Sequence, residues 1–188
     1  MPGSRTIKTL TALVVSLTIG AFALMMLETA PVEAPAQHLA AVEAGNTEAG
    51  KVVRRTAVPL QPIKWRNIIL HGSAAERGDI LDRVHFLVAD DGAIQPTLLW
   101  QRQQSGHHAY VAGRDFNADS IGICLIGDYS RRGPERRQFE AVADLTTTLQ
   151  RMFRIPADRV YLQSDLERGR PSPGPGFPAA RFNEMLLR

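Results

Sequence analysis

The chain has 188 residues, a single cysteine and a formal net charge of +3, with 22 Lys and Arg against 19 Asp and Glu. One cysteine excludes an intrachain disulfide, and the lack of interleaved basic and aromatic residues along a strand argues against nucleic acid as a partner. The modest positive charge suits an anionic polymer or membrane surface, and it equally suits plain surface solubility.

Residues 1–28 predict a signal peptide or an N-terminal membrane anchor. Arg5 and Lys8 form a basic flank, and Thr9–Leu27 contains no charged residue and is close to the ~20 residues needed to cross a bilayer. Small residues follow in LETAPVEAPA, so cleavage and retention both stay open. In either case the part of the chain that follows is expected to be exported.

The next segment differs in composition from the rest of the chain. Glu28–Gly50 is rich in Ala, Glu and Pro and has neither an aromatic residue nor a periodic apolar face. Such a segment buries too little surface to offset the entropy of ordering it. We therefore expect a disordered tether over residues 29–59 and one globular domain over residues 60–188.

Short apolar runs bounded by turn residues alternate with helical patterns in this domain, which predicts an α/β or α+β fold. SIGICLIG is apolar on both faces, which is typical of a strand in the middle of a sheet. The fold class expected is a mixed central β-sheet flanked by helices. The expected strands are Asn67–His71, His85–Ala89, Ala93–Leu98, Ser120–Gly127 and Val160–Leu162.

Two helices are expected after the central strand. From Pro134, apolar residues recur at spacings of three and four as far as Phe153, and Ile155-Pro156 ends the pattern. The loop RGRPSPGPGF then precedes a short terminal helix over Ala179–Leu187.

The order of these features resembles the family of zinc N-acetylmuramoyl-L-alanine amidases and peptidoglycan recognition proteins, from about Trp65 to the C-terminus. The most specific part is the run Asn117–Asp128, NADSIGICLIGD. HFLV, Asp91-Gly92 and Gln138 at the start of the long helix support the resemblance in the right order. It implies a peptidoglycan ligand and a place in the bacterial cell envelope, anchored in the inner membrane facing the periplasm or secreted.

The resemblance also implies a metal site that this chain only partly keeps. Active members of the family hold zinc with a histidine on the first strand, a second histidine after the long helix, and a cysteine or aspartate before a Pro-Gly turn. His71 matches the first ligand, but Gln163 and Ser172 stand at the other two positions. Amide and hydroxyl oxygens bind zinc far more weakly than imidazole or thiolate. We expect no zinc, although zinc stays possible if other residues rebuild the site.

His71 therefore has two interpretations. It is either a hydrogen-bonded histidine that preserves the shape of a pocket, or a metal ligand with unconventional partners drawn from His107, His108 or Asp165. Val84 replaces a tyrosine that helps catalysis in the family. No residue is assigned a catalytic role.

Other reactive side chains are expected to be structural. His85 in HFLV and Cys124 inside the central strand are expected to pack in the core. Trp100 is open between stacking on a sugar ring and partial burial. Asp165 at a strand end is more typical of a turn or cap.

The leading hypothesis is a domain that binds muramyl peptide without cutting it, through His71, His108, Asn117, Gln163 and Arg170. The alternatives are an active amidase with unconventional zinc ligands and a scaffold that binds another envelope protein. Whether the protein is an enzyme is therefore left open. Residues 72–84 form a short connection compared with many family members, which would leave one wall of the groove low.

Overall fold

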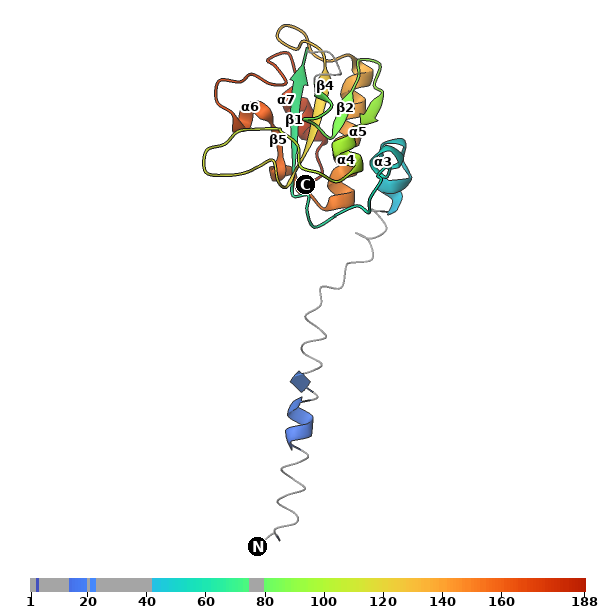
Figure 1. The fold of residues 1–188 in the computed structure, drawn as a ribbon, viewed down its shortest axis with the longest axis vertical. Helices are drawn as coiled ribbons and strands as arrows, with labels where there is room; N and C mark the ends of the chain where they lie inside the picture. The colour runs from blue at the N-terminus through green and yellow to red at the C-terminus, as the bar shows by residue number, and fades with distance from the viewer. Residues whose placement is uncertain (1–2, 4–13, 20, 23–41, 75–79) are drawn as a thin grey trace. The chain divides into compact units, whose positions relative to one another are not determined.

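The computed structural model describes residues 3, 14–19, 21–22, 42–74 and 80–188 (Figure 1). The chain divides into two compact units, Met1–Pro35 and Ala36–Arg188. Within the described ranges, no helix is both long enough and apolar enough to cross a membrane. Most of the expected anchor, Thr9–Leu27, lies outside these ranges, so the anchor stays a prediction.

The second unit is built on a five-stranded sheet with the strand order β3-β2-β4-β1-β5. All neighbouring pairs are parallel except β2 with β3. The predicted mixed sheet is confirmed, and SIGICLI is its middle strand. The strands are β1 (Asn67–Ser73), β2 (Phe86–Val88), β3 (Ile94–Pro96), β4 (Ser120–Ile126) and β5 (Val160–Leu162).

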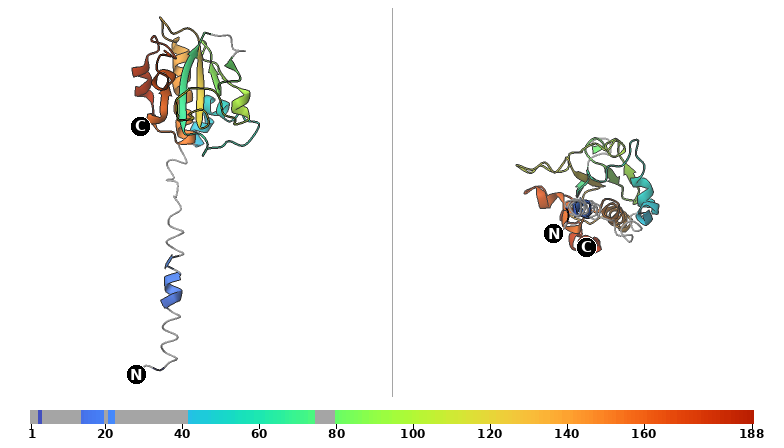
Figure 2. Two further views of the ribbon diagram at one scale, coloured as in Figure 1. Left: turned by 60° about the vertical axis from the view of Figure 1, so that its left-hand side comes forward. Right: turned by 90° about the horizontal axis from the view of Figure 1, so that it is seen from below.

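The two faces of the sheet are covered differently (Figures 1 and 2). Because successive side chains of a strand point to opposite faces, Ile68 and Leu70 pack with the apolar side of the long helix α5 (Arg136–Phe153). Ile69 points the other way and packs with Ala109 and Phe116 from the long segment before β4. His71 has the same parity as Ile69 and therefore lies on the face away from α5.

Helix α5 begins close to the predicted position and is held to the sheet by one buried amide. The Gln138 side chain donates to the carbonyl oxygens of Val88 and Ile126, at 3.0 and 2.9 Å, and accepts from the Tyr129 hydroxyl at 2.8 Å. The helix ends at Arg154, whose backbone is left-handed with φ 56°. Ile155-Pro156 follows, as the sequence predicts.

The remaining helical elements are short. The terminal helix α7 ends at Met185, two residues before the predicted end at Leu187. The elements are α3 (Glu48–Val53), α4 (Leu98–Gln101), the 3₁₀ turn Ala157–Arg159, α6 (Gln163–Leu166) and α7 (Ala179–Met185).

The predicted tether over 29–59 extends too far toward the C-terminus. Residues 42–46 are helical, and α3 follows with Thr47 as its cap. Val53 is fully buried, and its carbonyl oxygen accepts from the Trp100 indole at 2.8 Å. This segment packs through small residues such as Ala49, which leave no apolar stripe in the sequence. The domain therefore begins before residue 60; residues 29–41 lie outside the described ranges.

Candidate ligand-binding groove

A polar hollow lies at the carboxyl ends of β1 and β5, on the face of the sheet away from α5. Parallel strands bring their carboxyl ends to one edge of a sheet, where ligand sites are common. The hollow has a volume of about 320 Å³, and we call it the groove. Its lining includes His71, Ile80, Arg83, His107, Gln163, Arg170 and Ser172. Three of the five predicted ligand-binding residues, His71, Gln163 and Arg170, are thus brought together.

His71 ends the buried part of β1 and faces the groove. Its side chain is buried, and Nε2 has no hydrogen-bond partner. Burial lowers the pKa of His71 to about 4, with a smaller contribution from the positive charge of Arg170. The imidazole is therefore neutral at neutral pH, and its Nε2 has no partner within the protein.

His108 lies directly behind His71. Its ring is 6.2 Å from the His71 ring, centroid to centroid, and neither of its ring nitrogens has a hydrogen-bond partner. The ring fits between two glycines, since a Cβ at Gly122 would lie 2.0 Å from its Nδ1 and a Cβ at Gly106 2.3 Å from its Cε1. Burial, followed by the neighbouring His85 and His71, lowers the pKa of His108 well below its usual value.

His85 lies next to His108, with ring centroids 4.9 Å apart, and is a core residue, as predicted. It is fully buried, its Nδ1 accepts from the Gly122 backbone at 2.9 Å, and its Nε2 lies 2.7 Å from the Gln104 carbonyl oxygen. Its ring packs edge-on against Trp65 at 4.9 Å and Trp100 at 6.0 Å. Both hydrogen-bonding atoms are therefore used.

Trp100, whose role the sequence leaves open, and Cys124, which the sequence predicts to be buried, also belong to the core. Trp100 is fully buried, with its indole bonded to Val53, so it presents no surface for a sugar. Cys124 is buried in β4, and burial raises the pKa of its thiol to about 12, which leaves it un-ionised. Asp165 caps α6 by accepting from the Leu162 backbone at 2.8 Å.

Asn117 and Gln163 position the loop that carries His108. The Asn117 Oδ1 accepts from the backbone of His108 at 2.7 Å and of Ala109 at 3.2 Å. The Gln163 amide donates to the His108 carbonyl oxygen at 2.8 Å. Asn117 is not among the residues that line the groove, and the structure shows it in this supporting role.

The charged side chains that line the groove are two arginines, Arg83 and Arg170. Arg170 is exposed and forms an ion pair with Glu167 at 3.2 Å. Arg83 also lines the groove, and its carbonyl oxygen accepts from the His107 backbone at 2.7 Å. Sequence reasoning missed Arg83 and Ile80, because nothing in the pattern around HFLV shows that residues 80–83 fold back over the end of β1.

The family comparison decides the identity of the domain. The family model described as N-acetylmuramoyl-L-alanine amidase matches residues 43–175, well over half of the chain. The chain belongs to the N-acetylmuramoyl-L-alanine amidase family. No curated protein matches the sequence.

Solved structures share the fold of this amidase-family domain. The endolysin amidase LysCS of Clostridium intestinale has a TM-score of 0.53 at 19% identity, over 69% of this chain and 88% of its own. AmiD of E. coli, solved with anhydro-N-acetylmuramic acid-L-Ala-D-gamma-Glu-L-Lys, has a TM-score of 0.57 at 20% identity, over 70% of this chain and 61% of its own.

A third similar structure is that of tracheal cytotoxin bound to the ectodomain complex of peptidoglycan recognition proteins LCa and LCx. It has a TM-score of 0.51 at 23% identity, over 67% of this chain and 86% of its own. At identities this low, the solved structures show that the fold is shared. The properties of the groove must be argued from the residues of this chain.

The side chains of this amidase-family groove do not fit a catalytic zinc. Such a site takes three protein ligands and leaves one position open. His71 Nε2 is available, but the Gln163 amide is bonded to the His108 carbonyl, and the Ser172 hydroxyl accepts from the Gly72 backbone at 3.1 Å. Across residues 42–74 and 80–188, no three His, Cys, Asp or Glu side chains lie close enough together to hold a metal ion.

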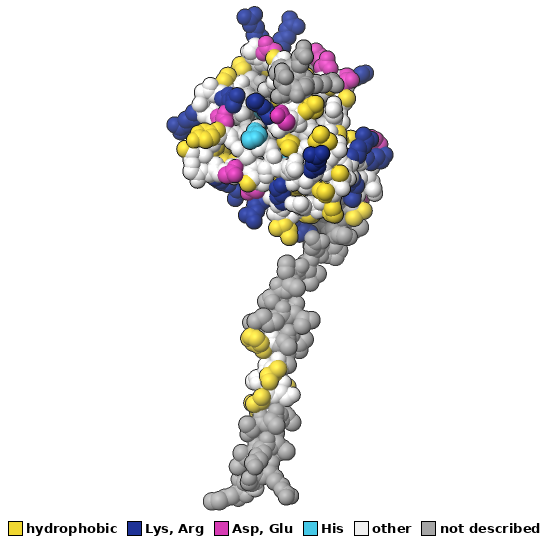
Figure 3. Space-filling view, viewed as in Figure 1, with side chains coloured by type: hydrophobic (Ala, Val, Ile, Leu, Met, Phe, Trp, Pro, Cys, Tyr) yellow, Lys and Arg dark blue, Asp and Glu magenta, His cyan; other side chains and the backbone are white. Residues whose placement is uncertain are grey.

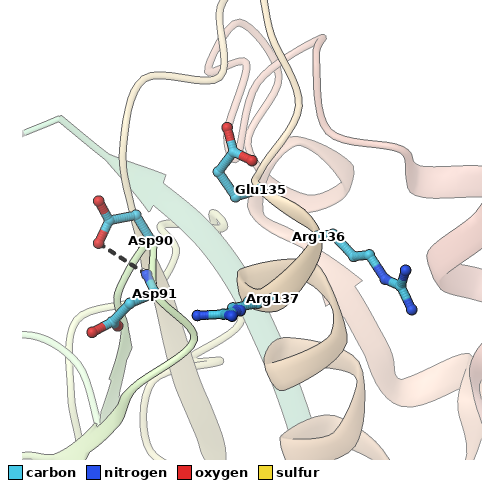
Figure 4. Close-up of a pocket in the computed structure, with 5 residues that line it drawn as sticks. All are labelled: Asp90, Asp91, Glu135, Arg136 and Arg137. Atoms are coloured by element: carbon cyan, nitrogen blue, oxygen red, sulfur yellow. Dashed lines mark hydrogen bonds between the residues drawn. The ribbon is translucent and has the colours of Figure 1, made fainter.

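A second hollow, of about 440 Å³, lies at the start of α5 (Figure 4). Exposed side chains of both signs line it: Asp90, Asp91, Glu135, Arg136 and Arg137. The Asp90 carboxylate accepts from the Asp91 backbone at 3.0 Å, which is a local turn contact. No histidine lines this hollow, and its surface resembles an ordinary solvated turn.

Proposed function

We propose that the groove binds the muramyl-peptide portion of peptidoglycan and that the domain does so without zinc-dependent hydrolysis. One observation carries the proposal: Gln163 and Ser172 are both engaged in structural hydrogen bonds, while the buried Nε2 of His71 is left to face the groove. The side chain that can meet a ligand is kept, and the two that would complete a zinc site are absent.

The chemistry of the groove suits such a ligand. A muramyl peptide combines sugar hydroxyls, amides and peptide carboxylates. The Arg83 and Arg170 guanidinium groups can each hold a carboxylate through two parallel hydrogen bonds. The neutral His71 imidazole provides one donor and one acceptor for an amide or hydroxyl. A volume of about 320 Å³ is within the range of small-ligand pockets.

Two further proposals follow from the sequence rather than from the groove. The protein is exported to the bacterial cell envelope, where peptidoglycan is found, and residues 1–28 either anchor it in the inner membrane or are removed. AmiD was solved with anhydro-N-acetylmuramic acid-L-Ala-D-gamma-Glu-L-Lys, and the peptidoglycan recognition proteins LCa and LCx with tracheal cytotoxin. The AmiD ligand chemistry is carried to this chain as part of the proposal.

The test is calorimetric titration of residues 36–188 with a soluble muramyl tripeptide, with and without a chelator. This part of the chain contains every residue of the buried clusters, so it carries a complete core. We expect binding that the chelator does not change and no release of peptide from sugar. His71→Ala and Arg170→Gln should each weaken binding by about tenfold or more, the loss of one charge-assisted or buried hydrogen bond.

Arg168→Gln is the matched control, because Arg168 is exposed on the same loop and does not line the groove. Peptide release that the chelator abolishes would establish the amidase alternative instead. A wild-type domain that does not bind the muramyl peptide would leave the scaffold alternative.

A further inference from the structure

The end of the domain opposite the groove contains a third hollow, of about 510 Å³. Several of its residues directly precede strands: Arg66 precedes β1, Asp119 precedes β4, and Arg159 precedes β5. Because these three strands are parallel, their amino ends meet at one edge of the sheet. The groove lies at the other edge, where the same strands end.

The chemistry of this end is cationic and partly apolar. Its lining includes four arginines, Arg66, Arg114, Arg154 and Arg159, against a single acidic residue, Asp119. Ile63 lies among them with 87% of its surface exposed, the largest value among the exposed large hydrophobic residues that the structure describes. We call Ile63 and the four arginines the arginine end. Basic and hydrophobic side chains lie next to one another at the lower end of the domain in Figure 3.

The chain also enters the domain at this end. The carbonyl oxygen of Val53, the last residue of α3, bonds to the Trp100 indole. The Trp100 ring lies 5.9 Å from Trp65 and 5.8 Å from Phe153, both of which line the hollow. The segment from α3 to β1, which includes Ile63, runs along the lower end of the domain in Figure 1.

We infer that the arginine end binds an anionic phospholipid surface, with the guanidinium groups on lipid phosphates and Ile63 in the interfacial layer. Arginine forks match phosphate oxygens, and an exposed apolar side chain among basic residues is typical of surfaces that lie on a membrane. The uncharged segment Thr9–Leu27 ends only 14 residues before residue 42, a connection of at most about 50 Å.

This placement has a consequence for the groove. With the arginine end on the bilayer, the carboxyl ends of β1 and β5 point away from the lipid. The groove then opens toward the side on which a polymer outside the membrane is found. The inference does not require the groove to bind peptidoglycan, so the two proposals fail separately.

The test uses residues 36–188, which lack the apolar N-terminal segment, in a vesicle co-sedimentation assay. One set of vesicles contains phosphatidylglycerol and phosphatidylcholine in equal parts, and the other contains phosphatidylcholine alone. We expect binding to the first set only, weakening as salt is added. Arg66→Gln combined with Arg159→Gln should lower the affinity about 25-fold, from ~5-fold for each arginine near an anionic surface.

Arg131→Gln combined with Arg132→Gln is the matched control, since both residues are exposed and follow β4 at the other edge of the sheet. It removes the same charge and should leave vesicle affinity nearly unchanged. Ile63→Ser should weaken binding without changing its dependence on salt, whereas Leu98→Ser, at another exposed aliphatic side chain, should have no effect.

Three results would overturn the inference. The first is equal binding to both vesicle sets, and the second is an equal loss in the control variant, which would mean that net charge alone attracts the domain. The third is release from vesicles by inorganic phosphate much more effectively than by chloride at the same ionic strength. That result would assign the hollow to free phosphate rather than to a membrane surface.

Discussion

His85 in the core differs from His71, which lines the groove, and from His108, which is buried near His71: the same side chain is used in opposite states. Both ring nitrogens of His85 have partners, and two tryptophans pack against its ring. His71 Nε2 and both nitrogens of His108 are buried without a hydrogen-bond partner. A satisfied buried histidine stabilises a fold, whereas an unsatisfied one costs free energy that a bound ligand can recover. The comparison separates histidines whose hydrogen bonds hold the domain together from histidines with unsatisfied buried nitrogens.

The largest expected change is the return of a metal site to the groove. Gln163→His combined with Ser172→Cys would place the two missing ligands beside His71. We expect the double variant to retain about one zinc per chain after desalting, because three protein ligands suffice for a site of this type. Zinc content measured by mass spectrometry of the desalted protein checks this, with each single variant as a control.

Wild-type protein is expected to retain no stoichiometric zinc in the same experiment. Zinc that wild type retains and that His71→Ala removes would show that unconventional ligands have rebuilt the site, and the proposed function would then give way to the amidase alternative.

The second prediction concerns the stability of the domain in acid, to which the histidines of both regions contribute. Burial holds the pKa of His71 and of His85 at about 4 and lowers that of His108, against an ordinary value of 6.5 in the unfolded chain. The unfolded chain therefore binds more protons below pH 6.5. The free energy of unfolding is therefore unaffected by these titrations above pH 6.5 and falls as the pH drops from 6.5 toward 4, on the order of several kcal/mol in total.

Urea unfolding at a series of pH values between about 8 and about 4, a range that spans the ordinary and the lowered histidine pKa values, measures this loss of unfolding free energy. His108→Gln should reduce the slope of unfolding free energy against pH, because it removes one of the buried titrating groups. An unchanged slope would mean that the carboxylates, not the histidines, control acid stability.

The third prediction separates the two regions by mutation. His85→Ala removes a ring that bridges the Gly122 amide and the Gln104 carbonyl and should lower the free energy of unfolding by about 3 kcal/mol. His71→Ala removes a ring whose Nε2 has no partner and should cost about 1 kcal/mol or less. Urea unfolding of the two variants measures the difference, and equal losses would contradict the distinction between core and groove.

The smallest measured quantity is a coupling energy, and it concerns the fit of His108 between its glycines. Gly122→Ala should destabilise the domain by about 1–3 kcal/mol, because its Cβ would overlap the ring at Nδ1. His108→Ala in the same chain should recover part of that loss, giving a coupling energy of about 1 kcal/mol between the two positions. Strictly additive losses would mean that β4 does not require a glycine for the sake of His108.

Several features were readable from the sequence because they depend on local patterns. The central strand follows from an apolar run on both faces, and α5 follows from residues at spacings of three and four that end before a proline. His71, Gln163 and Arg170 were placed in the groove by their order along the family pattern. The packed segment 42–53 was missed, since it contacts the domain through Ala49, Gly50 and the Val53 carbonyl, and such contacts leave no periodic signal.

The sequence by itself determined the order and type of the elements and showed a glutamine and a serine at positions 163 and 172, because periodicity and residue chemistry are local properties. Only the tertiary structure decided which polar groups are satisfied. It turned Asn117 into a support for the His108 loop, brought Arg83 to the groove, and gathered arginines from before β1, before β5 and after α5 at the opposite end. These outcomes depend on which segments distant in the chain pack together, and hydrogen-bond satisfaction and charge clustering are set by that packing alone.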